Sequence, residues 1–175
     1  IHQAYSEFIK NNESYVITLS NLGKITGADC ESKKVYVFEN QTVFSHICEE
    51  LKDMKISALC TSGQIKTASL LLIDMLCHSD CEIYYSGDTD PEGIVIANKI
   101  ICRNPQKIRP WRMTVQDYYD SISDKPVTDE RLIQFDNVTD SRFFDVCKAV
   151  KKEKLAGFQE QLIDKMIDDI KIGKI

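Results

Sequence analysis

The sequence predicts an α/β fold with a doubly wound, mainly parallel sheet, helices on both faces and a further helix near the C-terminus. Short apolar segments at 35–38, 56–60 and 82–85 have the length and composition of buried strands. A helical pattern follows each of them within a few residues. Strands that alternate with helices form parallel sheets with right-handed crossovers. We therefore expect the carboxyl ends of these strands to share one edge of the sheet.

The remaining elements follow the same patterns. The helices expected after the three strands cover about residues 42–51, 65–76 and 91–101. A fourth strand is expected at 108–113, with a short helix at 115–122. Apolar residues at helical spacing mark one face of a long C-terminal helix: Leu155, Phe158, Leu162, Met166 and Ile170. Gly157 weakens the first turn of that helix.

Length and composition indicate one compact domain, which we place at 31–175, after a junction to an upstream domain at 1–30 that includes the strand-like Tyr15–Leu19. The chain has 175 residues, of which 43% are apolar and 28% charged. It begins with Ile1, and no signal peptide or apolar run of about 18 residues follows. Seven scattered cysteines favour reduced thiols over disulfides. We expect an excised piece of a cytoplasmic protein with no membrane association.

Acidic residues follow two of the predicted strands. Glu39 comes directly after Val35–Phe38, and Asp88 and Asp90 follow the strand that begins at Glu82. Open parallel sheets bind ligands outside the carboxyl ends of their strands, near the point where the strand order reverses. We therefore expect the three acids to converge, although about fifty residues separate Glu39 from the other two.

A metal ion is the expected partner of such a cluster. Three close carboxylates repel one another unless a cation neutralises them, and hard oxygen ligands favour Mg²⁺ or Mn²⁺. Mg²⁺ commonly shares its shell with a substrate phosphate, which points to phosphoryl chemistry. Zinc is less consistent with the sequence, because no second pair of ligands completes the group Cys77, His78, Asp80 and Cys81.

Each acid also has a structural explanation. Asp90 precedes Pro91, and Asp followed by Pro is a typical helix start, so the two explanations are balanced for Asp90. The structural explanation is weaker for Glu39 and Asp88. Glutamate is a poor N-cap, and a carboxylate that ends an apolar strand is costly unless it is paired or bound to metal.

Any contact with DNA must be local, because the net charge is −5. Arg109 and Arg112 lie in the acid-free stretch that contains the expected fourth strand and are the candidates for guiding the DNA backbone. Lys66 stands at the end of a glycine-containing loop before a helix, where backbone amides could meet a phosphate. Solvated surface and an ordinary strand-to-helix turn are the simpler explanations of these cations.

The strand-terminal glutamate and the later Asp-x-Asp resemble the Toprim domains, which are Rossmann-like domains of topoisomerases, primases and related nucleases. Val35–Asn40 and Ser86–Gly93 look most similar to the topoisomerase VI A subunit and to the C-terminal domain of the Wadjet plasmid-defence nuclease JetD. Ala156–Glu160 resembles the end of the JetD-type domain. The resemblance covers about residues 15–170, although its specific motifs occupy a small part of that span.

The resemblance implies Mg²⁺-dependent cleavage of DNA. Glu39 would be the general acid or base and a metal partner, while Asp88 and Asp90 would hold Mg²⁺. Glu92 stands where many Toprim motifs have another acid, and it would bind a second metal or favour the positive end of its helix. The cleaving tyrosine of the topoisomerase relatives belongs to a separate domain. The likeness to JetD implies an SMC-type complex that presents DNA and a homodimer that makes paired cuts.

Two other functions stay open at this stage. A Toprim-like module without cleavage activity would keep the fold and the acids and would bind DNA or a partner. A sugar-nucleotide transferase or a phosphatase could also use an Asp-x-Asp after a strand, but neither gives Glu39 a role.

Overall fold

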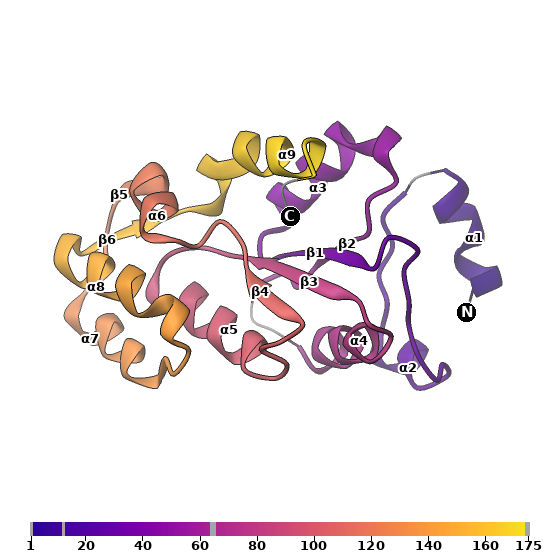
Figure 1. Ribbon diagram of the computed structural model, residues 1–175, viewed down its shortest axis with the longest axis horizontal. Coiled ribbons are helices and arrows are strands. Elements are labelled where there is room, and N and C mark those ends of the chain that lie inside the picture. Colours follow the sequence, from indigo (N-terminus) through magenta and orange to yellow (C-terminus); the bar gives the residue numbers. More distant parts are fainter. Residues whose placement is uncertain (1, 12, 64–65, 174–175) are drawn as a thin grey trace.

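A four-stranded parallel sheet lies at the centre of the protein (Figure 1). The structure is a computed structural model that describes residues 2–11, 13–63 and 66–173. The strands are β1 (Lys34–Phe38), β2 (Ala58–Cys60), β3 (Glu82–Ser86) and β4 (Ile108–Pro110). Their order across the sheet is β2-β1-β3-β4. This confirms the predicted parallel α/β sheet, and the arrangement is Rossmann-like.

Helices connect and cover these strands. The connecting helices are α3 (Gln41–Glu50), α4 (Thr67–His78) and α5 (Pro91–Ile101). A second, two-stranded antiparallel sheet pairs β5 (Ile122–Pro126) with β6 (Leu155–Gly157). The other α-helices are α1 (His2–Lys10), α2 (Leu19–Leu22), α6 (Val115–Ser121), α7 (Asp129–Leu132), α8 (Phe144–Glu153) and α9 (Ile163–Lys171). Short 3₁₀ helices are η1 (Lys52–Met54), η2 (Ile133–Asn137), η3 (Ser141–Phe143) and η4 (Gln159–Leu162).

Alternate residues of β1 face two separate apolar cores. Val35 and Val37 lie in the core that contains buried residues of α4 and α5, while Tyr36 and Phe38 lie in the core formed with α3 and α9. Figure 1 shows α3 and α9 on one side of the sheet and α4 and α5 on the other. A strand buried on both faces must be apolar at successive positions, which explains the uninterrupted apolar run in the sequence.

The sheet changes its winding direction between β1 and β3. α3 leads from β1 to its neighbour β2, and α4 then leads back past β1 to β3 on the opposite face. β1 and β3 are adjacent and aligned from Lys34 opposite Glu82 to Phe38 opposite Ser86. The residues that follow Phe38 and Ser86 therefore lie side by side at the switch point, where open α/β sheets bind ligands.

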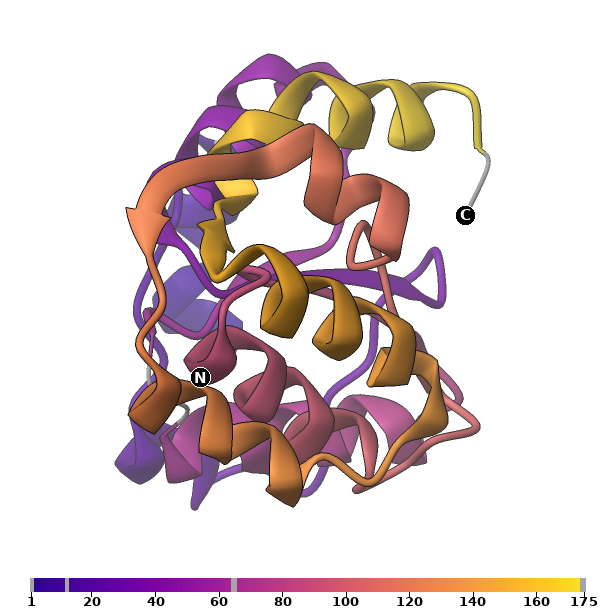
Figure 2. The same cartoon turned by 90° about the vertical axis from the view of Figure 1, so that its left-hand side faces the viewer.

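The C-terminal segment corrects the predicted long helix. Its second half is helical as expected, and Leu162, Met166 and Ile170 are buried with residues of α3. Its first half forms β6 instead, because Gly157 exchanges backbone hydrogen bonds with Thr89 and β6 pairs with β5. Such pairing depends on residues far away in the chain, which helical spacing cannot reveal. Figure 2 shows β5, β6 and the helices α6 to α8 gathered at this end of the molecule.

The N-terminal segment also differs from the prediction. Residues 15–18 form no strand, and Thr18 caps α2 by accepting a hydrogen bond from the Asn21 backbone at 3.2 Å. Leu22 is buried, and Ala28 and Cys30 pack against the larger core. The boundary at residue 30 stays a prediction.

All seven cysteines are free thiols, as predicted. Within the described ranges, no helix has the length and apolar character that crossing a membrane requires.

Candidate functional site

Glu39 is the first residue beyond β1, and its carboxylate lies over the loop that follows β3. Its backbone N–H still donates to Ser86 O at 3.0 Å, which extends the pairing of the two strands. A Cβ atom on Gly87 would lie 2.5 Å from Glu39 Oε2. Glycine at position 87 thus leaves room for the Glu39 carboxylate, which would have to move away from any larger side chain. Glu39 Oε2 in turn accepts a long hydrogen bond of 3.4 Å from the Asp88 backbone.

Asp88 is held from two sides. Its Oδ1 accepts a hydrogen bond of 2.8 Å from the backbone of Gln159, in η4. The start of α5 packs closely under it, since a Cβ atom on Gly93 would lie 2.3 Å from the Asp88 carbonyl oxygen. The structure thus brings Glu39 and Asp88 together, from segments that are 49 residues apart.

The pKa values of these two carboxyl groups are both raised. Burial, together with the charges of Asp88, Asp90 and Glu160, raises the pKa of Glu39 to about 7. Burial also raises the pKa of Asp88 to about 6, with the charges of Glu160 and Asp90 acting in the same direction. Acidic groups that titrate near neutral pH occur often at catalytic and ligand-binding sites.

Asp90 lies at the same edge of the sheet, formed by the segments that follow β1, β2 and β3 and called the rim below. Its carboxylate already accepts hydrogen bonds from other residues of the protein. Its Oδ1 caps α5 by accepting 2.9 Å from the Gly93 backbone, and its Oδ2 accepts 2.6 Å from Arg131 of α7. The helix-start explanation of Asp90 is therefore realised in the structure. It does not exclude a ligand, because each carboxylate oxygen has a further lone pair.

Glu92 faces Arg131 as well. The Arg131 guanidinium and the Gln134 amide both donate to its carboxylate. The hydrogen bond with Arg131 is the main reason why the pKa of Glu92 falls to about 2. The structure therefore gives Glu92 an ion pair as its principal partner.

The segment that follows β6 contacts both loops of the site, which its local sequence pattern does not predict. Gln159 is buried, and its Oε1 accepts 3.4 Å from the Asn40 backbone, next to Glu39. Asn40 Nδ2 donates to Glu160 Oε1 at 2.5 Å. The resemblance singles out Ala156–Glu160, but the helical spacing of this part of the sequence gives no sign that its residues bridge the loops after β1 and β3. No local pattern connects Arg131 with Glu92, 39 residues away.

The loop after β2 lies on the same rim as Glu39. Thr61 and Gly63 donate backbone hydrogen bonds to Phe38 O at 2.9 Å and Glu39 O at 3.0 Å. Lys66 is exposed at the N-cap of α4. Residues 64 and 65, which complete the predicted phosphate-binding loop, lie outside the described residues.

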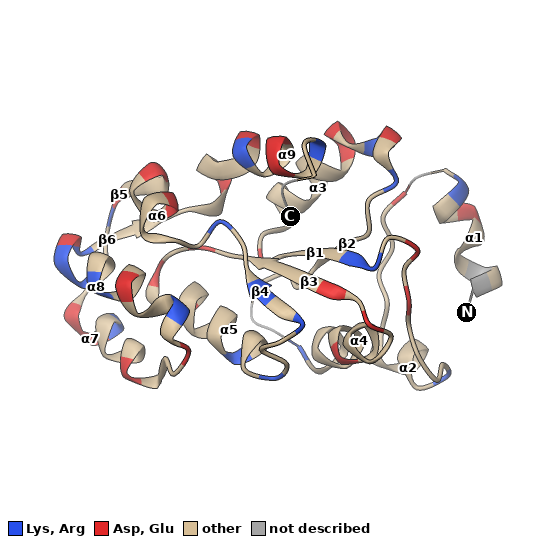
Figure 3. Ribbon diagram, viewed as in Figure 1, with Lys and Arg blue, Asp and Glu red and all other residues tan. Residues whose placement is uncertain are grey.

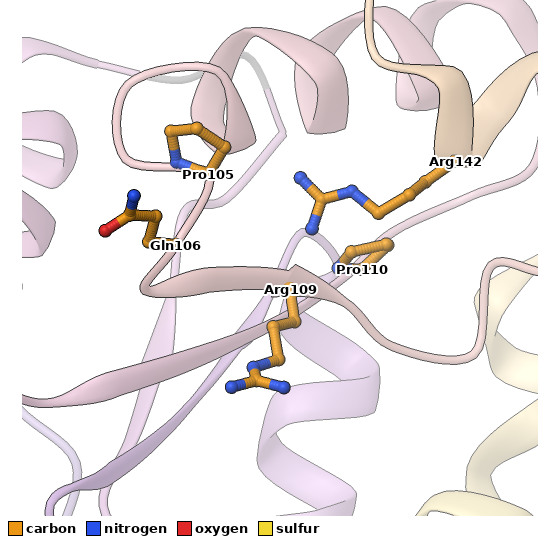
Figure 4. Close-up of a pocket in the computed structure, with 5 residues that line it drawn as sticks. All are labelled: Pro105, Gln106, Arg109, Pro110 and Arg142. Carbon is orange, nitrogen blue, oxygen red and sulfur yellow. The ribbon is translucent and has the colours of Figure 1, made fainter.

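The two predicted DNA-guiding arginines do not meet the acids. Arg109 pairs with Glu82 at 2.9 Å, at the opposite end of β3 from Asp88. It lines a surface pocket with Arg142, and Figure 4 shows the two guanidinium groups on opposite sides of β4. Arg142 is itself paired with Asp140 at 2.6 Å.

The hydrogen-bond partners of Arg112 belong to α6 and α9. Its guanidinium donates two hydrogen bonds of 2.7 Å to Asp169 of α9, one of 3.3 Å to Asp117 of α6, and one of 3.2 Å to the Lys165 carbonyl. Asp169 and Asp117 are both buried. The geometry favours a role for Arg112 in holding α6 and α9 together over the predicted contact with DNA.

Comparison with known proteins assigns the family. The family described as "Protein of unknown function C-terminus (DUF2399)" matches residues 15–170. The chain belongs to this family. The DUF2399 match begins inside the segment predicted as a junction and includes the rim with Glu39, Asp88 and Glu160. No curated protein matches the chain significantly.

The residues of this DUF2399 domain can be tested for their fit to a metal ion. Among the described residues, no group of three or more His, Cys, Asp or Glu side chains is placed so that it could hold a metal ion, and the predicted trio of Glu39, Asp88 and Asp90 is no exception. Mg²⁺ does not need such a group, because it commonly binds one or two carboxylates, water and substrate phosphate. Glu39 and Asp88 provide two such carboxylates. Ser86 Oγ and Gln159 Nε2 are buried on the same segments without a partner in the described structure, which suits a further polar ligand here.

Proposed function

We propose that this chain is a Toprim-type domain that hydrolyses the phosphodiester backbone of DNA with Mg²⁺ or Mn²⁺. One observation carries the proposal: the half-buried carboxyl groups of Glu39 and Asp88 lie at the ends of β1 and β3, where the sheet changes its winding direction, and Glu39 Oε2 accepts a hydrogen bond from the Asp88 backbone. The strand-terminal Glu and the Asp-x-Asp have the order found in Toprim domains. The raised pKa values of both groups support a site that is completed by a cation.

Glu39 and Asp88 would hold the metal, with Asp90 beside them. When bound, the ion supplies an activated water and neutralises charge on the phosphate. Asp88 is positioned for this role by the Gln159 N–H, which fixes one of its oxygens. Arg131 and the α5 backbone fix Asp90 in the same way.

Glu39 is the group best suited to move a proton. Its pKa of about 7 means that Oε2 can accept a proton from water or return one to the leaving oxygen near neutral pH. The carboxylate lies over Gly87, and its Oε2 accepts a hydrogen bond of 3.4 Å from the Asp88 backbone. A bound cation would lower this pKa, so that Glu39 would act mainly as a base and a ligand in the loaded protein.

The arrangement around Asp90 favours a second candidate function. Arg131 neutralises both Asp90 and Glu92, which reduces the negative charge available to a metal. A Toprim-like module that binds DNA or a protein partner without cleaving DNA would not need the full negative charge of these acids. The two candidates differ in one outcome, which is turnover.

The resemblance to JetD extends the proposal to partners. This resemblance implies a role in defence against plasmids or other foreign DNA. It also implies that an SMC-type complex presents the DNA and that a homodimer makes paired cuts. These statements rest on family analogy.

Cleavage of supercoiled plasmid tests the proposal. The full chain, incubated with plasmid and Mg²⁺ or Mn²⁺, should produce nicked or linear DNA, and EDTA should prevent it. Glu39→Gln and Asp88→Asn should each reduce the rate by at least a hundredfold, because each removes a ligand charge and preserves the size of the side chain.

Matched exposed variants separate this effect from a general change of charge. Glu49→Gln and Asp53→Asn alter surface acids of the same type at the end of α3 and in η1, and should cut at the wild-type rate. Cleavage that persists in both site variants would refute the assignment. DNA binding without cleavage by the wild-type chain would select the noncatalytic module.

A further inference from the structure

Lys125 places a positive charge beside the acidic rim. It lies in β5, whose residues Ile122 and Pro126 are aligned with Gly157 and Leu155 of β6. Its Nζ is 5.3 Å from the ring centroid of Phe158. Phe158 directly precedes Gln159, whose backbone holds Asp88. A cation over an aromatic face is attracted to the ring but keeps its N–H donors available.

The charge of Lys125 is not neutralised by an ion pair. Across residues 2–11, 13–63 and 66–173, no carboxylate lies within 4.0 Å of its Nζ, although the side chain is exposed. The neighbouring lysines of α8 and its C-cap differ. Each of them has a carboxylate partner: Lys148 with Asp145, Lys151 with Asp136, Lys152 with Glu153 and Lys154 with Asp129.

Lys125 is linked to Asp88 through neighbouring residues. Its Nζ lies over the Phe158 ring, and the next residue, Gln159, donates its backbone N–H to Asp88 Oδ1 at 2.8 Å. The arginines considered earlier are committed elsewhere, Arg109 to Glu82 and Arg112 to Asp169. Figure 3 shows acidic and basic residues interspersed along the helices, so local placement decides which cation can serve a site.

We propose that Lys125 binds a backbone phosphate of the DNA that occupies the Glu39–Asp88 rim. The inference rests on the proposed function and adds the residue that holds the anionic substrate against an acidic site. A carboxylate rim repels a phosphodiester, and an unpaired ammonium at its border offsets that repulsion. The contact with Phe158 limits the positions of the ammonium group, so less side-chain entropy is lost when phosphate binds.

Salt-dependent binding tests this proposal. The full chain carrying Glu39→Gln, which prevents cleavage, is titrated against a fluorescent DNA duplex between 50 and 200 mM salt. Adding Lys125→Gln should weaken binding and make the plot of log affinity against log salt less steep by about 0.9, the value for one lost phosphate contact. Lys125→Arg keeps the charge and the ring contact, and should restore most of the slope.

Lys154→Gln is the matched control. It removes the same charge from a lysine at the same end of the molecule that is already paired with Asp129, and its slope should equal that of the parent. Equal slopes for Lys125→Gln and Lys154→Gln would overturn the inference. Melting temperatures of the variants check that the exposed substitution leaves the fold intact.

Plasmid cleavage by the chain without Glu39→Gln distinguishes the two levels of proposal. Metal-dependent cleavage with no change of slope in Lys125→Gln would leave the nuclease proposal standing and remove the role of Lys125. A reduced slope in a chain that cuts no DNA would retain the phosphate contact and remove the hydrolytic function.

Discussion

The carboxyl groups of Glu39 and Asp88 make the metal-free protein sensitive to pH. Their pKa values of about 7 and about 6 exceed the ordinary values of 4.5 and 3.8. The folded state therefore binds more protons than the unfolded chain between about pH 4 and pH 7. Stability falls as pH rises through this window, because ionisation is penalised only in the folded protein.

We predict that Glu39→Gln stabilises the metal-free protein at pH 8 and has little effect on stability at pH 4. The expected gain in the free energy of unfolding at pH 8 is on the order of 2 kcal/mol. This is less than the whole pKa shift of Glu39 corresponds to, because part of that shift comes from the charge of Asp88. In a chain of this length that gain raises the melting temperature by roughly 4–8 °C. Thermal melts at both pH values measure it. Equal melting temperatures of the wild type and Glu39→Gln at pH 8 would show that ionisation of Glu39 costs the folded protein no stability.

Single residues were the easiest part of the site to predict. Glu39 and Asp88 stand out because an acid directly beyond an apolar strand is costly without a partner. Arg131, Gln159 and Lys125 carry no such local signal. They reach the rim from α7, η4 and β5, and only the fold reveals that they are neighbours of the acids.

At the scale of elements, β6 shows why a periodic pattern can mislead. The spacing of Leu155, Phe158 and Leu162 fits a helix, yet residues 155–157 form a strand. The bridge between Gly157 and Thr89 joins the small sheet to the Asp88–Asp90 loop. Gly157, which weakened the helix prediction, is the residue that this close contact requires.

We predict that Gly157→Ala disturbs the site as well as the fold. The added Cβ would lie 2.2 Å from Thr89 Oγ1 and 2.8 Å from Ser121 Oγ, so β6 must move away from the loop. Overpacking of this kind costs about 1–3 kcal/mol. Urea unfolding should show this loss, and plasmid cleavage should slow more than for an equally destabilised variant elsewhere.

Gly27→Ala is the control for that change. Its Cβ would meet no atom within 4 Å. Its stability and cleavage rate should match the wild type. A Gly157→Ala variant with wild-type stability would mean that the bridge to Thr89 is not formed in solution.

At the scale of the whole molecule, the alternation of strands and helices was enough to predict the parallel sheet and its two covered faces. The strand order β2-β1-β3-β4 was not contained in that alternation, because it depends on which face each crossover takes. That order makes β1 and β3 neighbours. The strand order therefore brings Glu39 and Asp88, which are distant in the chain, to one site at the switch point.

Anomalous diffraction from crystals of the full chain grown with Mn²⁺ tests the central claim most directly. The metal position is read from its own scattering and does not depend on activity. The proposed function predicts an anomalous peak at the carboxyl ends of β1 and β3, about 2 Å from carboxylate oxygens of both Glu39 and Asp88. A rim without such a peak at saturating Mn²⁺, with both carboxylates ordered, would contradict the claim that these two acids form a metal site.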